Sequence, residues 1–446
     1  MYHHERLTWL EGGSSKLEGR NVGAASGIGD KTNQKQVIPP TLISPRYQSV
    51  FLPQNFSRIQ CLIRDQTIPL NMSKQLAVRL NTTLALIDQF QSAFTTPSNN
   101  PSATESPRKD ALPLLSASSE ALKSQVTKLS LFTINTPFTP SAIGTILSAL
   151  NESVLPSLLT ATLLVTPNDY TNAFHSEVQT LSKTALSQLS SLVKEVKSVA
   201  EVKDKTKNDD QKESELSQPE KETITVATGR VWDSCDSIID LAAKGVVGFV
   251  TRRVEEWRDL VGDAVKEIEE WDPNEDDGGF FEEFLGDNGP EGDGDESEDS
   301  DEGKAEDNAA LHAHKKSTLR VLKPVGQAYP AIITNRLKNA GTVPSSSDAG
   351  VKKLESLMSN LQLIPEYVDE VAGALYDADL ETSDQYLQKA KSCATKAIGL
   401  VTLPWSPAEN ESNQQDTQDK FTVWSRTWLK VMEEVSKPAN GTLNTA

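Results

Sequence analysis

Residues 229–273, GRVWDSCDSIIDLAAKGVVGFVTRRVEEWRDLVGDAVKEIEEWDP, decide the fold of this chain. Apolar and small side chains recur along them at alternating spacings of three and four, which is the period of one face of an α-helix. The stretch therefore predicts a long amphipathic helix that packs against other helices, with a break near Gly245 and Gly248. The positions predicted to be buried are Cys235, Ile239, Ala242, Val246, Val250, Val254, Trp257, Val261, Ala264, Ile268 and Trp271.

The helical period recurs through the rest of the chain from Met72 onwards, and no segment alternates convincingly as a β-strand would. We therefore predict an all-α fold of two up-and-down helical bundles joined by an acidic disordered loop. Prolines inside three of the helices predict kinks or breaks, because proline lacks the N–H that the helix needs. These prolines are Pro156, Pro324, Pro330 and Pro365, and the last either breaks its helix or restarts it as a first-turn proline. The further helices are predicted over about 72–94, 109–132, 141–165, 168–200, 309–337, 348–376, 383–403 and 416–435.

Polar segments with few apolar side chains divide the chain into predicted parts. The parts are a disordered N-terminal extension (1–71), an N-terminal helical bundle (72–271) with a disordered insert (202–223), an acidic linker (272–308), a C-terminal helical bundle (309–437) and a disordered tail (438–446).

The first 71 residues differ in composition from the helical part of the chain. They are rich in Gly, Ser, Pro and Gln, whereas a helical pattern begins at once with Met72. Two interpretations stay open: Met72 is the natural start, or the extension is a natural flexible tail. Mass spectrometry of the native protein distinguishes them, since abundant peptides from before Lys74 would exclude a start at Met72.

Acidity is concentrated in a single tract. The formal net charge of the chain is −19, and residues 272–307 hold 17 acidic residues against one basic residue, Lys304. The remainder of the chain is therefore close to neutral. Because this tract would repel phosphate groups, we expect no direct binding to nucleic acid.

The cysteines and the apolar runs indicate the compartment. Cys61, Cys235 and Cys393 are far apart in the sequence, so they predict neither a disulfide framework nor a metal site. No apolar run reaches the roughly 18 residues of a membrane span, and the N-terminus does not resemble a secretory signal. We expect a protein of the cytoplasm and nucleus with no membrane contact, and its oligomeric state stays open.

Residue patterns that could carry chemistry are weak. Residues 272–283, DPNEDDGGFFEE, place Asp272, Asn274, Asp276 and Glu283 at ligand positions of a calcium loop, but Asp277 stands where that loop needs glycine. His312 and His314 are two residues apart on a predicted helix, so they cannot share a face. We predict no catalytic site, no metal site and no cofactor, and hence no enzyme.

Two features of the acidic tract suggest regulation. Ser297 and Ser300 lie among carboxylates, the setting that an acidophilic kinase prefers, although an unmodified solubilising tract fits equally. The aromatic residues of FFEEFL, at positions 280–285, either dock in a partner's groove or fold back onto the bundle.

The order of these parts resembles the cyclin-D-binding protein family, also called the GCIP family, in a fungal version. The similarity covers about residues 76–435, and it rests on helix order, the acidic loop and a few short motifs. The family-motif positions are Val231, Trp232, Cys235, Phe249, Trp271, Pro273, Pro365 and Tyr376. The N-terminal extension and the polar inserts depart from the compact pattern of the family.

The resemblance implies a non-enzymatic helical regulator of cell-cycle progression and transcription that acts by protein–protein interaction in the cytoplasm and nucleus. Its implied partners are cyclin-like or transcription-factor-like proteins, although a fungal source could lack D-type cyclins. Up-and-down bundles also resemble vinculin-like modules, so a cytoskeletal or adhesion-type adaptor is the alternative.

Overall fold

The computed structural model describes residues 72–94, 111–207, 215–274, 301–341, 347–405 and 419–435. These residues are helical apart from short turns and connections, and none of them forms a β-strand. The predicted all-α fold is confirmed. The predicted N-terminal extension, the C-terminal tail and acidic residues 275–300 lie outside the described residues.

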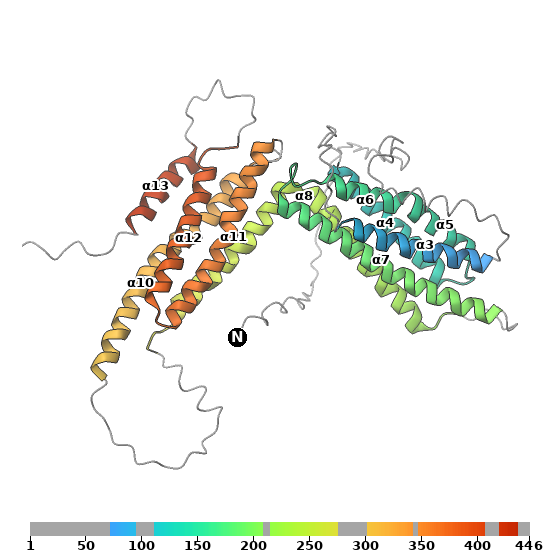
Figure 1. Ribbon diagram of the computed structural model, residues 1–446, viewed down its shortest axis with the longest axis horizontal. Coiled ribbons are helices and arrows are strands. Elements are labelled where there is room, and N and C mark those ends of the chain that lie inside the picture. The colour runs from blue at the N-terminus through green and yellow to red at the C-terminus, as the bar shows by residue number, and fades with distance from the viewer. Residues whose placement is uncertain are drawn as a thin grey trace, which may run out of the picture. The chain divides into compact units, whose positions relative to one another are not determined.

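A first group of helices precedes residue 208 (Figure 1). Contacts join α3 to α5 and α7, and α4 to α5 and α6. The distortion predicted at Pro156 is present as a π-helical turn, η1, immediately before the helix that holds this proline in its first turn. The members of this group are α3 (Met72–Ala93), α4 (Ala111–Ile134), α5 (Pro140–Ala149), η1 (Leu150–Val154), α6 (Leu155–Leu164) and α7 (Asn172–Lys207).

The segment Pro140–Leu164 is long and apolar enough to cross a membrane by length and composition alone. Inside this structure, 56% of its apolar window is buried. Leu147, Leu150, Leu155 and Leu158 are fully covered. A core helix passes the same test of composition, so the absence of a membrane contact stays a prediction.

The stretch that decides the fold lies in α8 (Gln218–Glu270). Gly245 has φ 64° and ψ −170°, a conformation essentially confined to glycine, so the predicted break is confirmed. Most of the predicted apolar face is buried, including Cys235, Val250 and Val254, whereas Ile239, Trp257 and Trp271 are half-buried.

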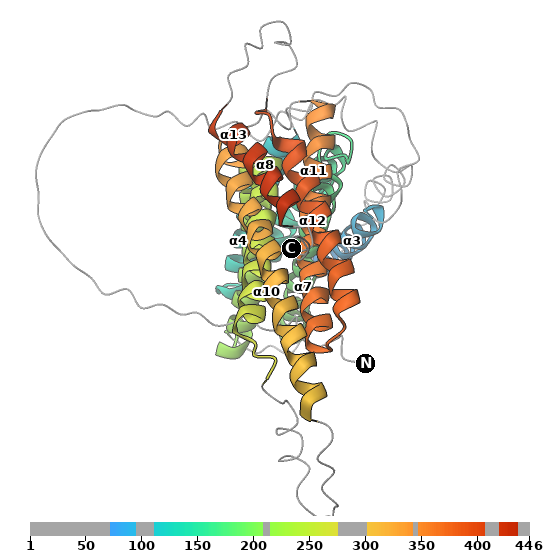
Figure 2. The same ribbon diagram turned by 90° about the vertical axis from the view of Figure 1, so that its left-hand side faces the viewer.

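A second group of helices follows residue 300 (Figure 2). α12 contacts α10, α11 and α13, and α10 also contacts α13. The members are α10 (Asp301–Ile332), a π-helical turn η2 (Ile333–Leu337), α11 (Asp348–Tyr376), α12 (Leu380–Val401) and α13 (Lys420–Glu434).

α8 serves both groups, which differs from the expectation that it closes the first bundle alone. It contacts α4 and α7 of the first group and α10 and α11 of the second group. The partners change within a few residues, because Arg253 pairs with Glu177 of α7 at 3.2 Å and Glu255 pairs with Lys338 beyond η2 at 2.9 Å. An apolar period shows that a face is buried, but it does not show which helix covers that face.

Helices also extend into segments expected to be disordered. α7 continues to Lys207 and α8 begins at Gln218, so both enter the predicted insert 202–223. Ser217 and Glu220 form a capping box at the start of α8, with the Glu220 carboxylate accepting from the Ser217 N–H at 2.8 Å. α10 likewise begins at Asp301, within the predicted acidic linker.

Three of the predicted proline breaks are wrong. α10 runs through Pro324 and Pro330, and α11 runs through Pro365. In α11, Pro365 leaves the carbonyl oxygen of Leu361 without its usual N–H donor. The hydroxyl of Tyr329, a fully buried residue of α10, donates to this oxygen at 2.8 Å. A neighbouring helix therefore supplies the bond that proline removes.

Replacing Tyr329 with phenylalanine leaves the Leu361 carbonyl without a donor in a dry core. We expect Tyr329→Phe to lower the free energy of unfolding by about 1–3 kcal/mol, measured by urea denaturation. Tyr367→Phe is the matched control, since Tyr367 packs its ring on Tyr386 and its hydroxyl has no hydrogen bond among the described residues. Equal stabilities of the two variants would contradict this role of Tyr329.

A paired substitution tests the break in α8. Gly245→Ala places a Cβ on a backbone with positive φ, and we expect a loss of about 1–3 kcal/mol in unfolding free energy. Gly262→Ala is the control, because Gly262 lies in the same helix, is exposed and has open space at its Cβ position. It should be neutral or stabilising by up to about 1 kcal/mol. A Gly245→Ala variant as stable as Gly262→Ala would show that the break is not required.

Candidate protein-interaction surface

An exposed indole lies on the ridge between α4 and α8. Trp232 is 36% exposed, and its ring N–H donates to the Thr127 hydroxyl at 3.2 Å. The Lys123 ammonium lies 5.9 Å from the centre of the ring and pairs with Asp236 at 2.6 Å. Leu131, 54% exposed, follows Thr127 by one helical turn on the same face of α4. We call Lys123, Thr127, Leu131, Trp232 and Asp236 the Trp232 ridge.

Buried neighbours hold the Trp232 ridge in place. Val231 and Cys235, which flank Trp232 within one turn of α8, have no exposed surface. Burial and the nearby charge of Asp236 raise the pKa of the Cys235 thiol to about 12. This cysteine therefore stays a neutral core residue, as does the buried Cys393. The indole is consequently presented to solvent by a rigid helix face.

Phe249 belongs to the core and not to the surface. It is 2% exposed and meets the ring of Phe174 edge to face at a centroid distance of 5.6 Å. The guanidinium groups of Arg252 and Arg253 cover the ring at 5.9 and 5.5 Å, and both pair with Glu177. The cluster fixes α7 against α8 just beyond the break at Gly245.

A second pair of motif residues meets at the end of α8. The rings of Trp271 and Tyr376 lie 5.0 Å apart, and Tyr376 is 39% exposed. Burial and the neighbouring Glu267 raise the pKa of Tyr376 to about 12. Lys315 of α10 donates to the carbonyl oxygens of Glu269 and Trp271, where a cation complements the helix dipole. This corner joins α8 to α10 and α11.

The motif residues therefore do not converge on one site. Val231, Trp232 and Cys235 lie together, Trp271 and Tyr376 form a separate corner, and Pro365 is buried inside α11. Pro273 follows the corner and is half-buried, while Ser297 and Ser300 lie outside the described residues.

The polar residues that the sequence singled out are also separated. His312 contacts Asn274 at 2.7 Å, whereas His314 contacts Ser383 at 3.3 Å, so the two histidines face different neighbours as expected. Within the described ranges, no group of three or more His, Cys, Asp or Glu side chains is arranged to hold a metal ion. Of the calcium-loop positions, only Asp272 and Asn274 are described.

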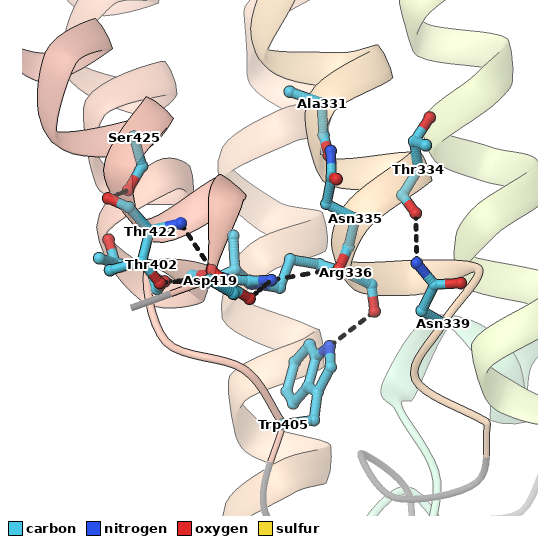
Figure 3. Close-up of polar contacts among 11 residues, drawn as sticks. Ala331, Thr334, Asn335, Arg336, Asn339, Thr402, Trp405, Asp419, Thr422 and Ser425 are labelled. Atoms are coloured by element: carbon cyan, nitrogen blue, oxygen red, sulfur yellow. Dashed lines mark hydrogen bonds and ion pairs between the residues drawn. The ribbon is translucent and has the colours of Figure 1, made fainter. Parts of the chain in front are cut away.

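Sequence reasoning missed a buried arginine. Arg336 is 3% exposed in η2 and donates to both carboxylate oxygens of Asp419, at 2.7 and 3.1 Å. It also donates to the carbonyl oxygens of Val401 and Thr402, at 2.7 and 2.8 Å (Figure 3). Asp419 in turn accepts from the Thr422 N–H at 2.7 Å and caps α13. One guanidinium therefore connects η2, the end of α12 and the start of α13.

Aromatic contacts complete the attachment of α13. The Phe421 ring lies 4.2 Å from the Arg336 guanidinium, and the indole N–H of Trp428 donates to the Pro324 carbonyl at 2.9 Å. Trp405, after α12, donates to the Arg336 carbonyl at 2.9 Å (Figure 3). The sequence signal was an arginine next to an apolar residue, Leu337, soon after two prolines, together with an aspartate at the start of a later helix.

Comparison with known proteins finds a family match that covers much of the first group of helices and α8. Residues 114–274 match the family model described as Grap2 and cyclin-D-interacting, N-terminal. The match contains most of α4 and all of α8, and therefore the whole Trp232 ridge. No curated protein matches the chain.

The ion pair of Arg336 and Asp419 predicts a pH dependence for the attachment of α13. Hydrogen bonds from Arg336 hold the pKa of the Asp419 carboxyl well below its ordinary value. A lowered pKa stabilises the folded state above about pH 4, and this contribution is lost progressively as the pH falls further. We expect wild type to exceed Asp419→Asn in stability at neutral pH and to lose this excess between about pH 4 and pH 2.

The fluorescence of tryptophans on α13 reports the transition, with hydrogen exchange of residues 420–434 as a local measure. Because other carboxyl groups titrate in both proteins, the difference between the two isolates Asp419. A difference that stays constant down to about pH 2 would contradict the assignment.

Proposed function

We propose that this chain regulates cell-cycle progression or transcription by binding partner proteins, because residues 114–274 match the family model described as Grap2 and cyclin-D-interacting, N-terminal. It acts through association rather than catalysis, and its partners are cyclin-like or transcription-factor-like proteins. A location in the cytoplasm and nucleus belongs to the same proposal, and so does a fungal source.

One observation carries the proposal: the matched segment presents an exposed indole on a rigid surface. Tryptophan dominates the energy of many protein interfaces, because it covers a large area with few rotatable bonds. The Thr127 hydroxyl and the buried neighbours Val231 and Cys235 hold Trp232 in one orientation before a partner arrives. Little conformational entropy is therefore lost when this ring is covered.

The chemistry of the Trp232 ridge indicates the kind of surface it binds. Leu131 and Trp232 offer apolar area, while Lys123 and Asp236 place opposite charges beside the ring. An amphipathic helix of a partner fits this pattern, with its apolar side chains on Leu131 and Trp232 and polar side chains at the rim.

Substitution of the indole tests the proposal directly. We expect Trp232→Ala to weaken binding of a purified D-type cyclin by roughly tenfold or more, as for a central interface residue. Isothermal titration calorimetry measures the affinity, and the melting temperature checks that the fold is retained. Leu260→Ala is the control, because Leu260 is 56% exposed on α8 but outside the Trp232 ridge.

If the source organism lacks D-type cyclins, partner capture from its native cells tests the proposal instead. The wild-type chain should recover cyclins, kinases or transcription factors, and Trp232→Ala should not. Enrichment of actin or adhesion proteins alone would favour the vinculin-like adaptor and refute the regulatory role. Fluorescent tagging checks the location.

A further inference from the structure

The strongest charge contrast in the chain lies between α10 and the tract that precedes it. From Asn308 to Leu337 the sequence has no acidic residue, while it has five lysines or arginines and two histidines. Residues 275–300, which connect α8 to α10, have twelve acidic residues and no basic residue. Opposite charges of this density within one chain attract each other over about 8–10 Å in physiological salt.

The basic side chains of α10 form two rows with different roles. One row faces α8, where Lys315 binds the Glu269 and Trp271 carbonyls and Lys323 pairs with the Glu269 carboxylate at 2.8 Å. The other row, His312, Lys316 and Arg320, is spaced by four residues and lies along one exposed face. We call these three residues the α10 basic strip.

Two charged side chains of the α10 basic strip are available to bind a further acidic group. Lys316 and Arg320 have neither a hydrogen-bond nor an ion-pair partner among the residues that the structure describes. The strip continues towards Pro324, whose carbonyl oxygen is taken by Trp428 of α13. Lys316 and Arg320 therefore lie between the contact of His312 with Asn274 and the contact of Trp428 with Pro324.

The last described residue before acidic residues 275–300 lies at the beginning of the α10 basic strip. Asn274, the last described residue after α8, contacts the His312 ring at 2.7 Å and accepts from the Asn308 amide at 3.4 Å. Lys316 and Arg320 follow His312 by one and two helical turns, a distance of about 12 Å in total. The next nine residues of the chain can span roughly 30 Å, so they easily reach both cations.

We propose that the α10 basic strip is the docking site of this chain's own acidic residues 275–300. The carboxylates of 275–277 and 282–283 pair with Lys316 and Arg320, beginning at the anchored Asn274. The tether at both ends supplies an effective concentration in the millimolar range, so individually weak ion pairs suffice. When docked, residues 275–300 prevent any acidic partner from binding the α10 basic strip. Phosphates on Ser297 and Ser300 would add negative charge, which favours the docked state.

Limited proteolysis of the full chain tests the proposal. A glutamate-specific protease cuts after Glu282 and Glu283 when these residues are free, and intact-mass spectrometry gives the rate. At low salt of about 20 mM we expect Lys316→Gln/Arg320→Gln to be cut roughly three to ten times faster than wild type, as two exposed ion pairs would give. At about 500 mM salt the two proteins should be cut at the same rate, because the charges are then screened.

The control changes the same charge elsewhere. Lys352→Gln/Lys396→Gln removes two exposed lysines of α11 and α12 and should be cut at the wild-type rate. Equal rates for wild type and the strip variant at low salt would overturn the proposal, as would a control that is cut as fast as the strip variant. Protection that rises with protein concentration would identify a second copy's tract as the occupant and would overturn docking within one chain.

Discussion

The buried face of α8 is the constraint on which the rest of the structure depends. Helices α4 and α7 contact this helix, and so do α10 and α11. Gly245 has a non-helical backbone with positive φ, so it kinks the chain inside α8. Arg253 and Glu255, two residues apart, pair with Glu177 of α7 and with Lys338 beyond η2, respectively.

Buried polar groups define how the second group of helices is arranged. Pro365 would leave a carbonyl oxygen unsatisfied in the core, and the Tyr329 hydroxyl removes that cost by bonding across to it. Arg336 does the same for the carbonyl oxygens at the end of α12, and its charge is balanced by Asp419. Both contacts are directional, so they favour one alignment of the helices over others that would bury similar apolar area.

The two proposed interaction surfaces depend on different forces, burial of apolar area in one and attraction between charges in the other. The Trp232 ridge combines a held indole with apolar area, which suits a partner that excludes water. The α10 basic strip is a row of solvated cations, which suits an acidic segment held nearby and depends on salt. The two surfaces lie on different helices, so occupation of one does not by itself cover the other.

The resemblance to the family came from features that are local in the sequence. The motif of Val231, Trp232 and Cys235 and the acidic end of α8 are visible without any tertiary contact, and residues 114–274, which contain both, match the N-terminal model of that family. The exposure of Trp232 could not be inferred in this way. Its position next to a buried cysteine places it at the edge of the apolar face, and only the neighbouring α4 determines how much of the ring is covered.

The amino-acid sequence by itself determined the helical class, the approximate helix limits and the break at Gly245, because periodicity and glycine geometry act over a few residues. It also determined the contrast in charge between the acidic tract and α10. The tertiary structure alone decided that α8 is shared, that Pro365 lies within an unbroken helix, and that Arg336 is buried. Each of these depends on a side chain or carbonyl from a distant segment, and the energy of such a contact is not encoded in local spacing.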